Sequence, residues 1–185
     1  MSALRGPDGT AAVAEAFSRA AARYDALAFD NPHLTRMRAK VHAHVQRAVP
    51  PGARILELNA GTGIDALELA RRGYAVHATD IAPDMLARAR AKAERSGLGE
   101  RFTVEGRSFE DLGSLPGASF DAVFSNFGGL NCAPDLGPVV AGVRHVLRPG
   151  GTVVWVVMPP ICPWELAQVA RGDLRTASRR LRRGP

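Results

Sequence analysis

Three residues have the types and spacing that suit ligand binding by backbone groups and a carboxylate. Gly61 and Gly63 lie between an apolar run and a helical pattern, in the stretch ILELNAGTGIDALELA. Glycine at such a turn lets the backbone approach a ligand closely, and a helix that begins near Gly63 offers unpaired N–H groups to an anionic group. Asp80 ends the next apolar run, where α/β folds bind their ligands. These positions predict a bound cofactor whose ribose is held by Asp80.

The same glycines are compatible with more than one cofactor class. Gly61, Gly63 and Ala66 also satisfy the dinucleotide pattern G-x-G-x-x-G/A, which is a weak signal when it stands alone. Asp80 fits a ribose-binding carboxylate in either class. These residues alone are therefore also compatible with an NAD(P)-dependent oxidoreductase.

Short apolar runs that alternate with helical patterns position these residues. The runs predicted as strands are 54–58, 75–79, 102–105, 121–125 and 152–158, and the helices between them are 63–72, 83–96 and 136–147. Two more helical stretches, 11–29 and about 34–48, precede the first strand. The alternation predicts an α/β fold, a Rossmann-like doubly wound parallel sheet with five recognisable strands and N-terminal helices.

The chain divides into three predicted parts. Pro50, Pro51 and Gly52 break the helical pattern, so residues 1–50 are predicted as N-terminal helices. Residues 51–160 are predicted as the cofactor-binding Rossmann-like core, and residues 161–185 as a basic C-terminal tail.

The loop after the first strand resembles the E-x-G-x-G-x-G loop of class I S-adenosylmethionine-dependent methyltransferases. Glu57, Asn59, Gly61 and Gly63 carry the resemblance, which departs from the pattern at Asn59. Asparagine tolerates a left-handed backbone better than most residues, so the turn is expected to form. The segment VLRPGGTVVWVVM strongly resembles the turn and fifth strand of the same enzymes.

The resemblance implies roles for residues at the nucleoside end of S-adenosylmethionine. Asp80 would accept hydrogen bonds from both ribose hydroxyls, and Ile81 and Met85 would pack on the adenine. Ser108 would bond the adenine amino group, and the backbone N–H of Phe109 would serve a ring nitrogen. The alternatives are core packing for Met85 and capping of the next turn by Ser108.

Further residues are implied at the amino-acid end of the cofactor. Asn126 and Phe127 follow the fourth strand, where the backbone of the family runs beneath the methionine portion. Tyr24 belongs to a helix that resembles the one closing over the cofactor, with a helix-packing aromatic as the alternative. No catalytic residue is identified, because methyl transfer depends chiefly on positioning and no general base is evident. His33, near the N-terminal helices, is the first histidine to test.

The resemblance implies methyl transfer from S-adenosylmethionine to a small-molecule acceptor. It is closest to the branch that includes quinone-biosynthesis and natural-product tailoring enzymes. The resemblance also implies that the N-terminal helices, residues 1–50, form the lid and the acceptor side of the site. Two alternatives remain: an NAD(P)-dependent oxidoreductase, and a non-catalytic cofactor-binding partner subunit or fragment of a methyltransferase.

Charge and cysteine content exclude several classes of function. The net charge is +6, but residues 171–185 hold six Arg and one Asp, so the rest is nearly neutral and no nucleic-acid partner is predicted. The N-terminus shows neither a signal peptide nor a membrane span, which predicts a cytoplasmic protein. Cys132 and Cys162 are too few for a zinc site or disulfide framework, so no metal is predicted.

The fifth strand is expected to be an exposed edge of the sheet. The family's sheet normally has two more strands, and the 27 residues after Met158 contain no second β-rich run. The run VVWVV would then expose unpaired backbone groups with no charge to protect them. The sequence predicts a second copy or a completing chain at this edge, with weak or no activity of the chain alone.

Overall fold

A single parallel sheet of five strands organises the computed structural model, which describes residues 7–159. The strands are β1 (Arg54–Leu58), β2 (Ala75–Asp80), β3 (Phe102–Gly106), β4 (Phe120–Ser125) and β5 (Leu147–Trp155), in the order β3-β2-β1-β4-β5. The helices are α1 (Pro7–Asp30), α2 (Pro32–Ala48), α3 (Ile64–Arg71), α4 (Pro83–Ser96) and α5 (Gly137–Val146), with 3₁₀ turns at Gly99–Arg101 and Gly129–Cys132. The Rossmann-like α/β fold predicted from the sequence is confirmed.

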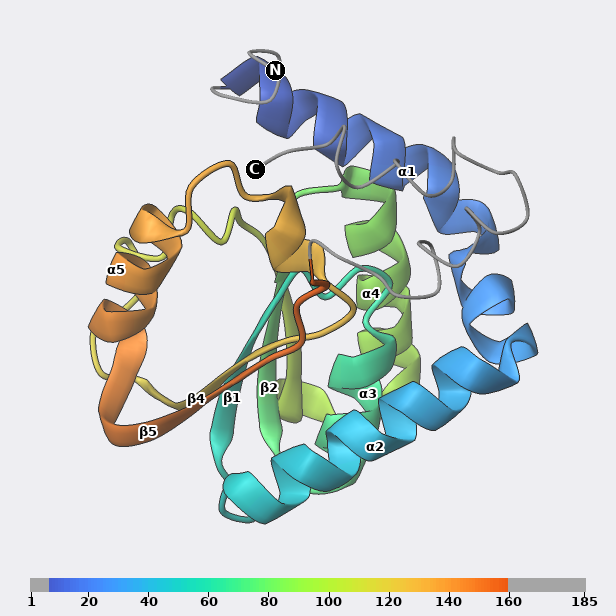
Figure 1. Cartoon of the computed structure of the whole chain (residues 1–185). Helices are drawn as coiled ribbons and strands as arrows, with labels where there is room; N and C mark the ends of the chain where they lie inside the picture. The colour runs from blue at the N-terminus through green and yellow to red at the C-terminus, as the bar shows by residue number, and fades with distance from the viewer. Residues whose placement is uncertain (1–6, 160–185) are drawn as a thin grey trace, which may run out of the picture.

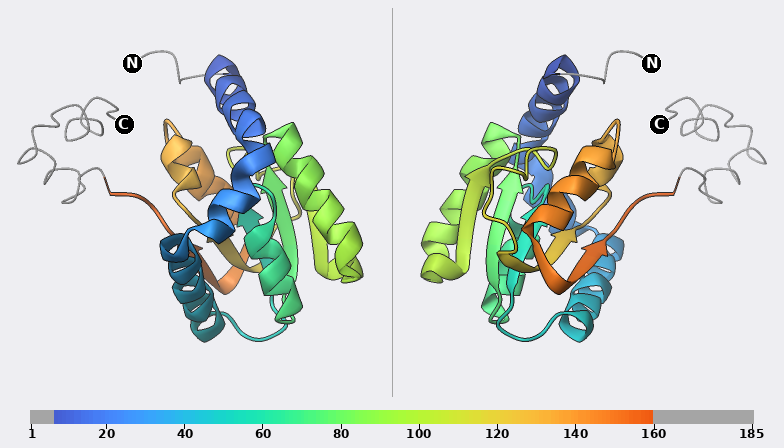
Figure 2. Two further views of the ribbon diagram at one scale, coloured as in Figure 1. Left: turned by 90° about the vertical axis from the view of Figure 1, so that its right-hand side faces the viewer. Right: turned by 90° about the vertical axis from the view of Figure 1, so that its left-hand side faces the viewer.

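Helices cover both faces of the sheet, as strand and helix alternation requires. Figure 1 shows α2, α3 and α4 on one side of the sheet and α5 on the other. Both views in Figure 2 place α1 across the end of the sheet toward which the strand arrows point. Because parallel strands end at one edge, α1 lies over the loops that follow β1, β2 and β4.

The two faces of the sheet bury separate apolar clusters, because side chains alternate along each strand. Ile55 of β1 packs with Leu69 of α3 and Val45 of α2 on one face. Leu56 of β1 packs with Val123 of β4 and Val143 of α5 on the other. Both faces of β1 are therefore buried, which fixes the central strand and the loop that follows it.

The fifth strand differs from its predicted limits. It was expected at 152–158 but spans Leu147–Trp155, and the pairing with β4 shifts between Phe120 and Ala122. The turn at Pro149, Gly150 and Gly151 falls inside these limits, with Gly150 at φ 77°. The strand thus begins before the turn because Leu147 already pairs with Phe120.

β5 lies at the edge of the sheet, as expected. Within residues 7–159 it pairs only with β4, and the side chain of Val153 is 43% exposed. The predicted Trp164–Ala170 helix, the arginine-rich tail and Cys162 lie outside the described residues. The three-part division at residues 50 and 160 remains a prediction.

Candidate functional site

The loop between β1 and α3 adopts the left-handed backbone that its sequence predicts. Asn59, Gly61 and Gly63 have φ of 49°, 57° and 74°. Asn59 therefore accommodates the conformation for which the family pattern has glycine. At Gly63 a Cβ would lie 2.9 Å from Phe102 and 3.1 Å from Ala89, so this glycine is also required by packing.

Asp80, at the end of β2, holds this loop through its carboxylate. Its Oδ2 accepts a hydrogen bond of 2.8 Å from the amide of Gly61, and its Oδ1 accepts one of 2.9 Å from the amide of Ala82. Burial raises the pKa of Asp80, while these amides act in the opposite direction. Each carboxylate oxygen can accept a further bond, so the group remains competent to bind hydroxyls.

Tyr24 of α1 lies over the glycine loop. A Cβ at Gly61 would be 3.8 Å from the Tyr24 ring and 3.9 Å from the sulfur of Met85. Met85 is buried with Ala21 and Ala82, and Tyr24 packs against this small cluster. Four predicted residues therefore lie together: Tyr24, Gly61, Asp80 and Met85. The buried position of Met85 is also the one expected if it is only a core residue.

A second group of predicted residues lines a small cavity beside Asp80. Ile81, Ser108 and Phe109 face Cys132 and Pro134, and the first turns of α1 close the cavity from above at Gly9, Thr10 and Val13. Its volume of about 20 Å³ leaves room for about one water molecule.

Ser108 is engaged within its own turn. Its hydroxyl oxygen accepts a hydrogen bond of 3.1 Å from the amide of Glu110. This is the capping role that the sequence left open as the alternative. The hydroxyl oxygen has a second lone pair that can accept a hydrogen bond from the adenine amino group, so the adenine contact remains a prediction.

Asn59 joins the ends of β1 and β4. Its Oδ1 accepts a 2.7 Å hydrogen bond from the Ser125 hydroxyl, and its Nδ2 donates a 3.2 Å bond to the carbonyl of Asn126. A Cβ at Gly129 would lie 2.2 Å from Asn59 Cγ, so this side chain occupies the space that glycine leaves at position 129. Asn59, which departs from the family pattern, thus fits because position 129, after β4, is a glycine.

A buried charged cluster, which was not predicted from the sequence, lies behind the loop. It consists of Arg38 and His42 of α2, Asp65 in the first turn of α3 and Asn126 after β4. Asp65 Oδ1 is 2.8 Å from Arg38 Nε and 2.6 Å from His42 Nε2, and Oδ2 accepts a 3.2 Å bond from Asn126 Nδ2. Burial raises the pKa of Asp65, but the contacts with His42 and Arg38 prevail and lower it.

Two predicted residues border this cluster. The guanidinium carbon of Arg38 lies 4.6 Å from the centre of the Phe127 ring, which is a cation–π distance. Glu57 is 1% exposed, and its Oε2 has no hydrogen-bond partner among the described residues. Burial, reinforced by the charge of Asp65, raises the pKa of Glu57 well above its usual value.

Sequence spacing contained a signal for the missed cluster. Arg38 and His42 are four residues apart on one helix and therefore share a face. Asp65 directly follows the glycine loop, where the first turn of a helix favours an acidic residue. The sequence does not show, however, that α2 and α3 pack together.

The described histidines and acidic residues form no metal site. Among residues 7–159, no group of three His, Cys, Asp or Glu side chains is arranged to hold a metal ion. His33 is exposed at the start of α2, and its backbone amide donates to the Asn31 side chain. No helix in the same range is both long and apolar enough to cross a membrane.

Two curated proteins show similarity over much of the chain. A demethylmenaquinone methyltransferase of Thermus thermophilus is 40% identical over 152 residues, covering 78% of this chain and 64% of that enzyme. An S-adenosyl-L-methionine-dependent Diels-Alderase of Talaromyces variabilis is 36% identical over 119 residues, covering 64% of this chain and 40% of that protein. The chain thus spans less than two thirds of the length of either relative.

A solved structure and a family model agree with the fold. An S-adenosylmethionine-dependent methyltransferase of Mesorhizobium loti is 29% identical with a TM-score of 0.57, covering 66% of this chain and 52% of that one. The model of a methyltransferase domain matches residues 55–151, which run from β1 into β5 and make up more than half of the chain. The chain therefore belongs to the methyltransferase domain family.

Proposed function

We propose that this chain binds S-adenosylmethionine and transfers its methyl group to a small-molecule acceptor. The observation that carries the proposal is the position of the Asp80 carboxylate. It accepts a hydrogen bond from the Gly61 amide at the edge of the sheet where the parallel strands end. Membership of a methyltransferase domain family supports the donor and the reaction.

The residues around the loop suit the parts of this donor. The cavity at Ile81, Ser108 and Phe109 takes the adenine, and Asp80 takes the ribose hydroxyls. Met85 would pack on the adenine and Tyr24 would reach the amino-acid end of the donor, and both side chains lie near Gly61.

Arg38 is the residue that we assign to the donor's carboxylate. Its Nε is bonded to Asp65, while its two terminal amino groups have no hydrogen bond within the described residues. A guanidinium has five N–H donors and binds carboxylates well, so a donor carboxylate would complete its shell. The buried Asp65 carboxylate, whose pKa is lowered by its contacts with His42 and Arg38, supplies negative charge on this side of the loop.

Positioning is the main catalytic contribution of this chain. When bound, the donor would supply an electrophilic methyl group: a nucleophile of the acceptor would bond to the methyl carbon in line as the carbon–sulfur bond breaks and S-adenosylhomocysteine leaves. Asp80 and Arg38 hold the two ends of the donor, and Tyr24 excludes water from the space above Gly61. No general base is assigned, and exposed His33 is the first histidine to substitute.

Binding and turnover experiments test the proposal. Titration calorimetry of the full chain should detect S-adenosylhomocysteine and no NAD(H). Transfer of a labelled methyl group to small quinol or phenol acceptors then tests the reaction. Binding of NAD(H) alone would support the oxidoreductase instead, and binding without transfer would support a non-catalytic partner subunit.

A second candidate reaction comes from the relative named as a Diels-Alderase. A cycloaddition forms carbon–carbon bonds within the bound substrate and consumes no methyl donor. Release of S-adenosylhomocysteine in step with product would identify methyl transfer. Product formation without such release would identify the cycloaddition.

We further propose a cytoplasmic protein without a nucleic-acid partner, with a second copy or completing chain at the edge of β5. The near-neutral charge of residues 1–170 supports the absence of nucleic acid. The exposed edge strand supports the association.

A further inference from the structure

Three segments that are distant in the sequence meet at a partly buried ion pair beside the glycine loop. Lys92 Nζ of α4 lies 2.7 Å from Asp25 Oδ2 of α1 and donates a 2.7 Å hydrogen bond to the carbonyl of Thr62. The Thr62 hydroxyl donates a 2.5 Å bond to Asp25 Oδ1. Thr62 is fully buried, and the side chains of Lys92 and Asp25 are 14% and 30% exposed. We call Asp25, Thr62 and Lys92 the latch.

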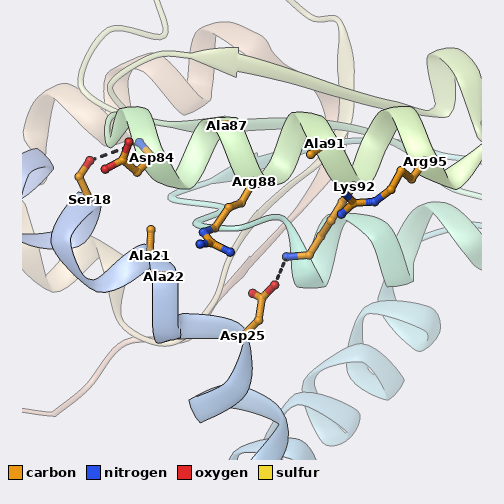
Figure 3. A pocket seen from close by; sticks show the side chains of 10 residues that line it. All are labelled: Ser18, Ala21, Ala22, Asp25, Asp84, Ala87, Arg88, Ala91, Lys92 and Arg95. Atoms are coloured by element: carbon orange, nitrogen blue, oxygen red, sulfur yellow. Dashed lines mark hydrogen bonds and ion pairs between the residues drawn. The ribbon is translucent and has the colours of Figure 1, made fainter.

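The apolar contact between this part of α1 and α4 is a small cluster in which Ala21 and Tyr24 pack against Met85. Figure 3 shows the two helices separated by an open groove, with Asp25 and Lys92 joined across it. The groove has a volume of about 430 Å³, and its walls include the small side chains of Ala22, Ala87 and Ala91. Ser18 makes a second polar contact across it, where its hydroxyl oxygen accepts a 3.3 Å bond from the amide of Asp84. These two polar contacts therefore add to the small apolar cluster in holding α1 against α4.

α1 borders the candidate cofactor site in two places. At one end of the helix, Gly9 and Val13 cover the cavity at Ile81 and Ser108, which holds no more than about one water molecule. An adenine ring is much larger than that, so the walls of this cavity, of which α1 is one, would have to separate for the nucleoside to enter. At its other end Tyr24, next to Asp25, lies over Gly61.

The latch also fixes the loop itself. Thr62 stands between Gly61 and Gly63, two residues with positive φ and the greatest backbone freedom in the loop. The Gly61 amide is the group that Asp80 binds. A displacement of Thr62 would therefore move the hydrogen bond that orients the Asp80 carboxylate.

We propose that Asp25 and Lys92 are positioning residues, which close α1 over the bound donor and hold the glycine loop through Thr62. The proposal rests on the proposed function, because it holds that these residues slow the release of bound S-adenosylmethionine. The ion pair is needed because a lysine in this position is costly by itself. Burial lowers the pKa of Lys92, while Asp25 opposes that shift and Arg88 and Arg95 reinforce it.

The experiment compares the full chain with Lys92→Met, Asp25→Asn and the conservative variant Lys92→Arg. Arg88→Met is the matched control, because it removes one positive charge from the same groove wall without a described hydrogen bond or ion pair. Labelled S-adenosylmethionine is bound first, and its release is followed after dilution into excess S-adenosylhomocysteine. Trypsin cleavage after Arg19 and Arg23 in α1, with no ligand present, reports opening of the helix directly.

We expect Lys92→Met and Asp25→Asn to release the donor about tenfold faster and to be cleaved faster in α1, because a charge-assisted bond is lost. Lys92→Arg should lie between them and the wild type, and Arg88→Met should match the wild type. Release and cleavage within about twofold of Arg88→Met for both latch variants would overturn the proposal. Failure of the wild type to bind the donor would instead refute the proposed function, and trypsin cleavage would still decide whether the latch exists. If Lys92→Met does not fold, Asp25→Asn provides the same comparison.

Discussion

At the residue scale, the Asp80 carboxylate both shapes the glycine loop and faces the site of the donor ribose. Its hydrogen bonds to the amides of Gly61 and Ala82 give the carboxylate a structural task at the end of β2 that requires no ligand. An asparagine at this position keeps one oxygen that accepts a backbone amide, but it loses the charge and the second acceptor.

We expect Asp80→Ala to weaken S-adenosylhomocysteine binding at least about tenfold, because each bond to a charged group contributes roughly 1.5 to 3 kcal/mol. Asp80→Asn should fall between the wild type and Asp80→Ala. Asp84→Asn, an exposed acid four residues further along, is the control. Unchanged affinity in a folded Asp80→Ala protein, measured by calorimetry, would remove Asp80 from the site.

Glu57 gives a prediction about pH. Burial raises its pKa in the folded state above the unfolded value of about 4.3. Folding therefore disfavours the ionised form, and stability is lost as pH rises from that unfolded value toward the raised folded pKa.

Glu57→Gln removes this titration. The free energy of unfolding of Glu57→Gln minus that of the wild type should increase as pH rises from about 4 toward neutrality. Urea denaturation at several pH values measures it, with the exposed Glu94→Gln as control. A difference that stays constant over this range would show that Glu57 is not perturbed.

At the element scale, Asp121 ties the beginnings of three strands together. Its Oδ2 accepts a 2.7 Å bond from the amide of Arg54 in β1, and its Oδ1 is 2.5 Å from Arg148 at the start of β5. The backbone bond from Arg54 is the main cause that lowers the pKa of Asp121, with Arg148 adding to it. The carboxylate is partly solvated, so its contribution to stability is modest.

We expect Asp121→Asn to lower the free energy of unfolding by about 0.5 to 1 kcal/mol at neutral pH. The folded pKa lies below the unfolded value of about 3.9, so this contribution exists above that value and is lost as pH falls through the folded pKa. Urea denaturation at pH 7 and near pH 3 should therefore show the two proteins converge in acid. A gap that persists undiminished in acid would contradict the charge-based account.

At the scale of the whole molecule, the central strand of the sheet is buried and β5 is an exposed edge strand. β1 is covered on both faces, whereas β5 has a neighbour on one side within residues 7–159. Edge strands without charges favour pairing with another chain.

We expect the full chain to self-associate through β5 in a concentration-dependent manner. Val153→Lys should reduce this association, because a charge on an edge strand opposes pairing. Val140→Lys on α5 is the matched control, since the two valines are 43% and 44% exposed. Light scattering coupled to size-exclusion chromatography measures the mass, and a monomer at all concentrations would contradict the expectation.

Local properties of the sequence determined the order of strands and helices and the position of the glycine loop. Apolar runs, helical spacing and the glycines at 61 and 63 act over a few residues, so they can be interpreted without the fold. The left-handed backbone at Asn59 was predictable for the same reason, and it is observed at φ 49°. The early start of β5 was missed, because Leu147 pairs with Phe120 across the sheet and this pairing leaves no local signal.

The tertiary structure alone decided which distant groups share one site. Arg38 meets Asp65 across 27 positions, and Asp25 meets Lys92 across 67, because α2 packs against the core beside α3 while α1 crosses the end of the sheet. Such pairs depend on how the helices pack. Many sequences with the same apolar pattern would pack their helices in other ways. The sequence by itself thus determined the family of the site, and the packing of the N-terminal helices decided which side chains surround it.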